Sequence, residues 1–137
     1  MSEKLTSFGL LVLRIGVGCM MMVHGWQKIQ GFEAMSENFA DPIGLGPKMS
    51  LILAISAEFG CSILVILGLL TRLAVIPLGF TMCIALFVVH AEDPWATQEK
   101  AALFLLMYVT LLFTGAGSFS VDKALFGRKK VEADAKK

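Results

Sequence analysis

The sequence contains little charge. Aspartate, glutamate, lysine and arginine make up 17% of the 137 residues, against about 25% in an average soluble domain. Apolar residues make up 56%, and a small soluble domain buries only part of its chain surface, so it could not hide so many. The composition excludes an ordinary soluble fold and makes the lipid bilayer the expected partner. The net charge of +1, with no basic stripe containing aromatic residues, argues against nucleic acid.

Cysteine and metal-binding motifs are also scarce. Cys19, Cys61 and Cys83 lie in three separate apolar runs, and no CxxC pair occurs. Spacings such as HxxxH or ExxH are absent, so no metal site is predicted. The cysteines are best interpreted as small packing residues, since free cysteine is usually buried. A redox dithiol would require two of them to meet in space.

Four long apolar runs are present. They cover residues 8–29, 49–70, 73–91 and 98–114, and about 20 helical residues cross a bilayer core. The first run is too long for a signal peptide and lacks an A-x-A exit, so it is expected to be a membrane span. Backbone groups in lipid need partners within their own segment, which favours helices. The predicted fold is an all-α, four-transmembrane-helix bundle.

The connecting segments differ in character. Between the first two spans, Phe32, Met35 and Phe39 fall on one side of a short helix and Glu33 and Glu37 on the other. This pattern predicts a short interfacial helix on the membrane surface. The domain division predicted from these features is a transmembrane domain at 1–127 and a basic cytoplasmic tail at 128–137. The polar chain after Asp122 is expected to be solvated and disordered.

The basic residues predict the orientation of the chain. Four crossings place both termini and the Thr71–Arg72 turn on one side, together with eight of the twelve basic residues. The other side has Lys28, Lys48 and Lys100 among a larger number of acidic residues. The positive-inside rule then places both termini in the cytoplasm, in the plasma (inner) membrane. Trp26 and Trp95 fall at the opposite boundary, as expected for aromatic belt residues.

Two ionisable residues lie deep in the predicted spans. Counting along the helices puts Glu58 about 13 Å below the outer surface and Arg14 about 10 Å above the inner surface. A charge at the bilayer centre costs about 2.5–3.5 kcal/mol on insertion scales, and pairing reduces that cost. We therefore expect Arg14 and Glu58 to pair, either as the floor of a polar cavity or as a packing device.

Four ionisable side chains from four helices are predicted to gather in the outer half, namely His24, Glu58, His90 and Glu99. Such a cluster could exchange protons, bind a quinone head group or hold a metal. Alternatively, each imidazole could satisfy a helix end at the interface. These residues are the catalytic candidates, and the sequence alone does not say whether the protein is an enzyme.

Several motifs resemble one known family. The segments are LRIGVGCMMMVHGWQKI, AEFGCSILVILGLLTRLA, a histidine ending the third span, QEKAALFLL and GAGSFSVD. Together, over residues 10–125, they resemble the DoxX family of small four-helix membrane proteins. The family commonly has GPGRYSLD near the inner surface, so a basic residue is missing in this chain. Cys61 also replaces a usual glycine. The family-type polar positions are Arg14, His24, Glu58, Arg72, His90, Glu99 and Asp122.

The resemblance implies a membrane protein associated with electron transfer. A quinone-reactive or accessory subunit of a membrane oxidoreductase is the first interpretation, with electrons supplied by a redox partner protein. The sequence shows no cofactor motif, so the cofactor is unknown, and quinone is the one that this interpretation implies. The resemblance adds Arg72 and Asp122 to Arg14 and Glu58 as a polar network. There are two alternatives. The first is a small-solute or proton carrier or channel, which a homo-oligomer could form, and the second is a non-catalytic partner that stabilises another enzyme.

Overall fold

The computed structural model describes residues 2–137, and this part of the chain is helical with no strand. Four helical segments are long and apolar enough to cross a membrane. The first is α1 (Glu3–Gln30) and the fourth is α6 (Trp95–Thr114). The second comprises α3 (Pro47–Ile55), the π-helix η1 (Ser56–Cys61) and α4 (Ser62–Leu67). The third comprises α5 (Thr71–Ile84) and the π-helix η2 (Ala85–Val89). The predicted four-helix transmembrane bundle is confirmed.

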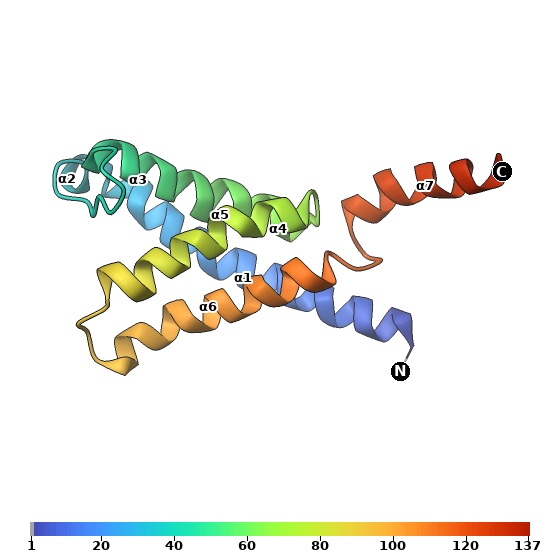
Figure 1. The fold of residues 1–137 in the computed structure, drawn as a ribbon, viewed down its shortest axis with the longest axis horizontal. Helices are drawn as coiled ribbons and strands as arrows, with labels where there is room; N and C mark the ends of the chain where they lie inside the picture. Colours follow the sequence, from blue (N-terminus) through green and yellow to red (C-terminus); the bar gives the residue numbers. More distant parts are fainter. Residues whose placement is uncertain (1) are drawn as a thin grey trace.

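The helices run up and down, so the bundle has two distinct ends (Figure 1). One end carries the N-terminus, the α4–α5 turn and the segment that follows α6; we call it the terminal end. The other carries residues 31–46 and the turn between η2 and α6; we call it the loop end. The loop end includes the short helix α2 (Phe32–Met35), which confirms the short helix predicted between the first two spans.

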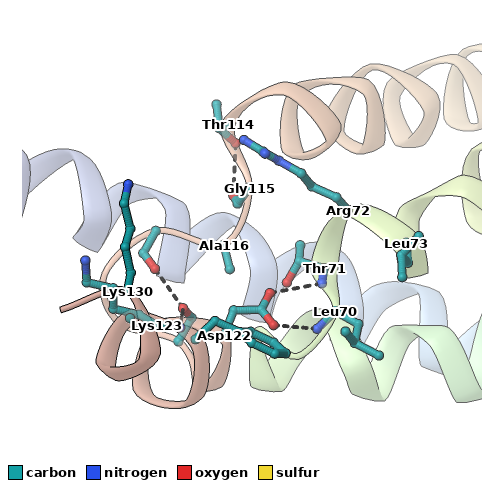
Figure 2. A pocket seen from close by; sticks show the side chains of 14 residues that line it. Leu70, Thr71, Arg72, Leu73, Thr114, Gly115, Ala116, Asp122, Lys123 and Lys130 are labelled. Atoms are coloured by element: carbon teal, nitrogen blue, oxygen red, sulfur yellow. Dashed lines mark hydrogen bonds between the residues drawn. The ribbon is translucent and has the colours of Figure 1, made fainter. Parts of the chain in front are cut away.

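Side-chain caps fasten the terminal end (Figure 2). The Asp122 carboxylate accepts hydrogen bonds from the backbone N–H groups of Leu70 at 2.7 Å and Thr71 at 3.2 Å, where α5 begins. The backbone N–H of Asp122 donates in turn to the Gly68 carbonyl at 2.9 Å. The otherwise unpaired donors of a helix start are thus satisfied by a residue some fifty positions later.

The chain after Asp122 forms a helix, α7 (Val121–Ala135), so the prediction of a disordered tail is wrong. Ser120 caps this helix by accepting a hydrogen bond from the Lys123 N–H at 3.2 Å. Asp122 sits in the first turn, where a negative charge is favourable. Alanine, leucine, lysine and glutamate supply high helix propensity through the rest. The helix has no buried residue, so its predicted solvation is consistent with the structure.

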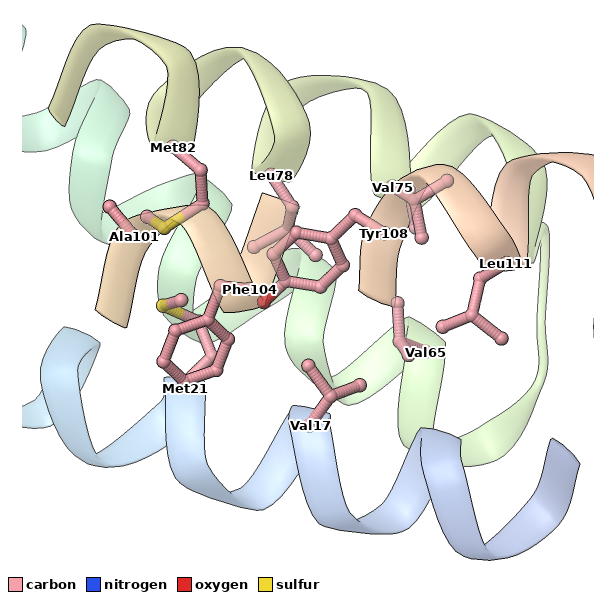
Figure 3. Close-up of a cluster of buried hydrophobic side chains, with 11 residues drawn as sticks. Val17, Met21, Val65, Val75, Leu78, Met82, Ala101, Phe104, Tyr108 and Leu111 are labelled. Carbon is pink, nitrogen blue, oxygen red and sulfur yellow. The ribbon is translucent and has the colours of Figure 1, made fainter. Parts of the chain in front are cut away.

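The hydrophobic core is a narrow column between the helices (Figure 3). Val17 and Met21 of α1 meet Val65 of α4, Leu78 of α5 and Tyr108 of α6, all at most 1% exposed. Even in the most buried of the four spans, only 39% of an apolar stretch of 18 residues lies inside the protein. The remaining apolar side chains face outward, which is stable only when lipid covers them. The chain is a membrane protein.

Candidate functional site

A polar cavity of about 260 Å³ opens at the loop end of the bundle. Side chains from α1, η1, α5 and α6 converge on it, so it lies between all four spans. His24, Glu58 and His90, three of the four candidates identified from the sequence, line it together. The full set of lining residues is Met21, His24, Lys28, Glu58, Met82, Ala85, His90, Thr97, Lys100, Ala101 and Phe104.

Glu58 is the most deeply buried ionisable residue of this cavity, and Lys28 is its partner. The Lys28 Nζ donates to Glu58 Oε2 at 2.7 Å. The glutamate side chain is 5% exposed and the lysine side chain 21% exposed. An unpaired carboxylate at this position would be costly in lipid, so the ammonium group stabilises it. The sequence pattern places Lys28 at the membrane boundary and does not indicate this contact.

The predicted pair between Arg14 and Glu58 is wrong. Arg14, fully buried, donates to the backbone carbonyls of Val65 at 3.3 Å and Ile66 at 3.1 Å, and also to Phe119. Glu58 lies seven to eight helical residues from those carbonyls, about 11 Å along the axis. The depth estimate failed because α1 packs so that Arg14 reaches the carboxyl-terminal end of α4.

At that position Arg14 has a structural role. The last carbonyls of a helix lack backbone donors and carry partial negative charge. A guanidinium group supplies both the missing N–H donors and a compensating positive charge. Gly68 ends α4 with a φ of 70°, and a Cβ there would touch the Arg14 guanidinium group. Glycine is thus required both for the left-handed turn and for the space the arginine occupies.

The two histidines of the polar cavity come from different elements, His24 from α1 and His90 from the turn that follows η2. The His24 ring meets Phe104 edge-on, with ring centroids 5.9 Å apart. His90 follows η2, and its Nδ1 lies 2.6 Å from Asp93 Oδ2. The His90 backbone carbonyl accepts a hydrogen bond from Gln98 Nε2 at 2.8 Å, which fixes the turn. His90 therefore has one ring nitrogen engaged and still faces the cavity.

Glu99 does not join this group. Its side chain is exposed on the first turns of α6 and is absent from the cavity wall, whereas its neighbour Lys100 lines the cavity. One helical position turns the side chain by about 100°, so only one of the two neighbours can face inward. The cluster therefore contains two cationic side chains, Lys28 and Lys100, that the sequence analysis did not include.

A second, mainly apolar cavity of about 370 Å³ adjoins the first. It lies between α3, α5 and the loop after α2, with Phe39, Leu53 and Phe80 among its apolar walls. Four residues line both cavities: Lys28, Glu58, Ala85 and His90. A ligand with an apolar body and a polar end could therefore lie in one cavity and present its polar atoms to the other.

Both π-helical segments lie at this junction. Glu58 lies within η1, and η2 ends directly before His90. π-helical turns are rare and often mark functional sites, because the extra residue re-aims side chains. Across from η1, a Cβ on Gly25 would lie 2.8 Å from the Phe59 backbone nitrogen. The close approach of α1 and η1 therefore depends on that glycine.

The remaining candidates, Arg72 and Asp122, lie at the terminal end. Arg72 Nη2 donates to the Phe113 carbonyl at 3.0 Å, near the last turn of α6. Asp122 caps α5, as described above. The predicted network of Arg14, Glu58, Arg72 and Asp122 is therefore divided between the two ends, since Glu58 pairs at the loop end. Within residues 2–137, no three histidine, cysteine or acidic side chains are arranged to hold a metal.

Comparison with known proteins identifies the family. The DoxX family model matches residues 9–91. The chain is 32% identical over 130 residues to inner membrane protein YqjF of Escherichia coli, covering 90% of this chain and 96% of the relative. It is also 32% identical over 129 residues to CatD of Bacillus subtilis, whose name suggests an oxidoreductase, covering 93% and 95%. No solved structure matches the chain. The protein belongs to the DoxX family.

Proposed function

We propose that the protein is a quinone-reactive or accessory subunit of a membrane oxidoreductase system. The quinone head group would bind where the apolar and polar cavities meet. The observation that carries this proposal is the shared wall: Lys28, Glu58, Ala85 and His90 line both cavities. The name of CatD supports an oxidoreductase connection for the family.

The apolar cavity suits the body of a quinone. Its volume of about 370 Å³ lies within the usual range for ligand pockets, about 300–1,000 Å³. Phe39 and Phe80 supply aromatic surface for a flat ring, and exposed Leu53 faces lipid, from which an isoprenoid quinone would arrive. Quinone carbonyls accept hydrogen bonds, and the Lys28 ammonium group at the junction has N–H donors besides the one that it gives to Glu58.

The polar cavity contains groups that can transfer the protons of the reaction. Reduction of a quinone to a quinol consumes two electrons and two protons. His24 and His90 supply imidazole groups, the side chains that most often transfer protons in enzymes, and the Lys28–Glu58 pair supplies neighbouring charges of both signs. The electrons would come from a partner redox protein, the accessory role that the proposal assigns to this chain.

A matched pair of variants tests the proposal. Glu58→Gln removes the carboxylate at the junction, whereas Glu99→Gln makes the same change on an exposed residue outside the cavity. Protein purified from native membranes with its partners should retain quinone and reduce it with a reductant. Glu58→Gln should lower both quinone retention and reduction at least tenfold, and Glu99→Gln should change neither.

Other outcomes would redirect the proposal. If quinone does not bind and Glu58→Gln abolishes proton or solute flux in liposomes, the protein is a carrier. If the complex assembles and keeps its activity with both variants, the chain is a non-catalytic partner. Either result would overturn the quinone role.

We also propose that both termini face the cytoplasm. Lys4, Arg72 and the basic residues of α7 all lie at the terminal end, and the positive-inside rule favours that end as the cytoplasmic one. The polar cavity would then open on the opposite side. Fusion of alkaline phosphatase and of a fluorescent protein to the C-terminus tests this topology: only the fluorescent fusion should be active.

A further inference from the structure

A third cavity, of about 490 Å³, lies at the terminal end and plays no part in the proposed function. It is bounded by the start of α5, the segment after α6 and the first turns of α7. Three basic side chains line it: Arg72 from α5, and Lys123 and Lys130 from α7. Figure 2 shows Arg72 extending towards Thr114, with Lys123 and Lys130 on the other side of Ala116.

Among residues 2–137, none of these three cations forms an ion pair with a carboxylate. The two ion pairs found within residues 2–137, Lys28–Glu58 and His90–Asp93, both lie at the loop end. Asp122 stands on the cavity wall, but its two oxygens accept hydrogen bonds from the backbone of Leu70 and Thr71. Three positive side chains and one carboxylate leave the cavity lining with a net charge of +2, which attracts an anion.

The cavity also has free hydrogen-bond donors on one of its cationic side chains. Arg72 uses one nitrogen for the Phe113 carbonyl, which leaves further N–H donors on its guanidinium group.

The position of the cavity indicates the source of the anion. It lies where α5 begins at Thr71 and α6 ends at Thr114, the level of lipid head groups for a helix that spans the bilayer. Leu73 and Phe126 line it as well and are 63% and 49% exposed. An occupant would therefore meet positive charge at one part and apolar, lipid-facing surface at another.

We propose that this cavity binds the phosphate group of an anionic phospholipid. Basic pockets at the membrane surface recognise such head groups by charge, and the free N–H donors of Arg72 add geometry. The exposed leucine and phenylalanine contact the start of the acyl chains. The lipid then fastens α7 to the ends of α5 and α6.

The test uses two double variants of equal charge. Lys123→Gln/Lys130→Gln removes two cavity lysines whose side chains make no hydrogen bond within the described chain. Lys129→Gln/Lys136→Gln removes one lysine of α7 and the lysine at its C-cap, both of which lie outside the cavity. Protein in mild detergent receives equal amounts of phosphatidylglycerol and phosphatidylcholine, and native mass spectrometry counts the retained lipids. Circular dichroism confirms that both variants fold.

Wild-type protein and the outer variant should retain phosphatidylglycerol in preference to phosphatidylcholine. In the cavity variant, the ratio of retained phosphatidylglycerol to phosphatidylcholine should fall about 10–30-fold, because each basic residue near anionic lipid contributes about 1 kcal/mol. Equal losses in both variants would mean that α7 attracts lipid only through its overall charge. No preference in the wild-type protein would also overturn the proposal. Arg72→Gln provides a third variant, in a different helix, and should weaken retention as well.

Inorganic phosphate distinguishes the lipid from a soluble anion. At millimolar concentration in neutral detergent, phosphate alone should neither raise the melting temperature nor displace phosphatidylglycerol. If phosphate stabilises the wild-type protein but not the cavity variant, and displaces the lipid, the site binds a soluble phosphate and the lipid assignment fails. These measurements use no quinone or redox assay, so their outcome is independent of the proposed function.

Discussion

Lys28, in the last turn of α1, donates a 2.7 Å hydrogen bond to Glu58, in the π-helix η1 of the second span. The pair joins two helices at the point where the polar and apolar cavities meet. Its lysine is partly exposed and its glutamate buried, so the lysine stem extends from the interface towards the acid. This geometry makes the charge on Glu58 compatible with its depth.

Removal of one partner should cost more than removal of both. Lys28→Met leaves the Glu58 carboxylate buried without its donor and should destabilise the protein by about 1–3 kcal/mol. Lys28→Met/Glu58→Gln should recover at least half of that loss. Lys100→Met is the control, since Lys100 lines the same cavity but forms no ion pair with a described residue. Thermal unfolding in detergent measures all four proteins.

Arg14 should behave independently of Glu58. Arg14→Gln removes the donors to the carbonyls of Val65 and Ile66 and should cost about 1–3 kcal/mol. Arg14→Lys should not restore the loss, because one ammonium group cannot reproduce the planar fork. The losses of Arg14→Gln and Glu58→Gln should add within about 0.5 kcal/mol in the double variant. A coupling energy larger than this would show that Arg14 and Glu58 interact, which would contradict the structure.

The contact between α1 and η1 should depend on Gly25. A Cβ there would lie 2.8 Å from the Phe59 backbone nitrogen, and backbone cannot move aside cheaply. Gly25→Ala should therefore separate the helices and destabilise the protein by about 1–3 kcal/mol, as overpacking does. Gly16→Ala, in the same helix with nothing within 4 Å, should be neutral or stabilising. Equal melting temperatures for the two variants would contradict the close approach.

The loop before α3 should loosen in acid. Asp41 accepts hydrogen bonds from Ser50, Gly46 and Leu45, and these lower the pKa of its carboxyl below the usual 3.8. Because the folded pKa is depressed, this stabilisation is complete above the usual pKa and is lost as pH falls through the folded value. The amide resonances of Leu45 and Gly46 should shift in that window. Asp41→Asn should remove the shift, and Ser50→Ala should move it to higher pH.

The spans could be predicted from the sequence, whereas the pairing of their charges could not. Long apolar runs mark membrane helices because each helix must satisfy its own backbone. Counting from span ends treats every helix as regular and upright. Arg14, Lys28 and Glu58 depart from that count because lysine extends several ångströms and α1 inclines across the bundle in Figure 1. Helix packing decides which side chains meet, and the residue pattern of a single sequence does not specify that packing.

Two local features were missed for different reasons. The π-helices at Glu58 and before His90 have no distinctive residue pattern, because an extra residue per turn is stabilised by neighbouring helices. The helix α7 could have been predicted, since Ser120 and Asp122 form a capping sequence ahead of strong helix formers. The polarity of this segment predicts solvation and not disorder, because a polar segment can also be a solvated helix.

Binding of a short-chain quinone, measured by isothermal titration calorimetry in detergent, tests the central claim most directly. Leu53→Trp places a bulky ring in the apolar cavity, and Leu106→Trp makes the same change on the exposed face of α6. The wild-type protein and Leu106→Trp should bind the quinone alike, and Leu53→Trp should bind it at least tenfold more weakly. Equal binding by all three proteins, or none by the wild type, would contradict a quinone site at the junction beside Glu58.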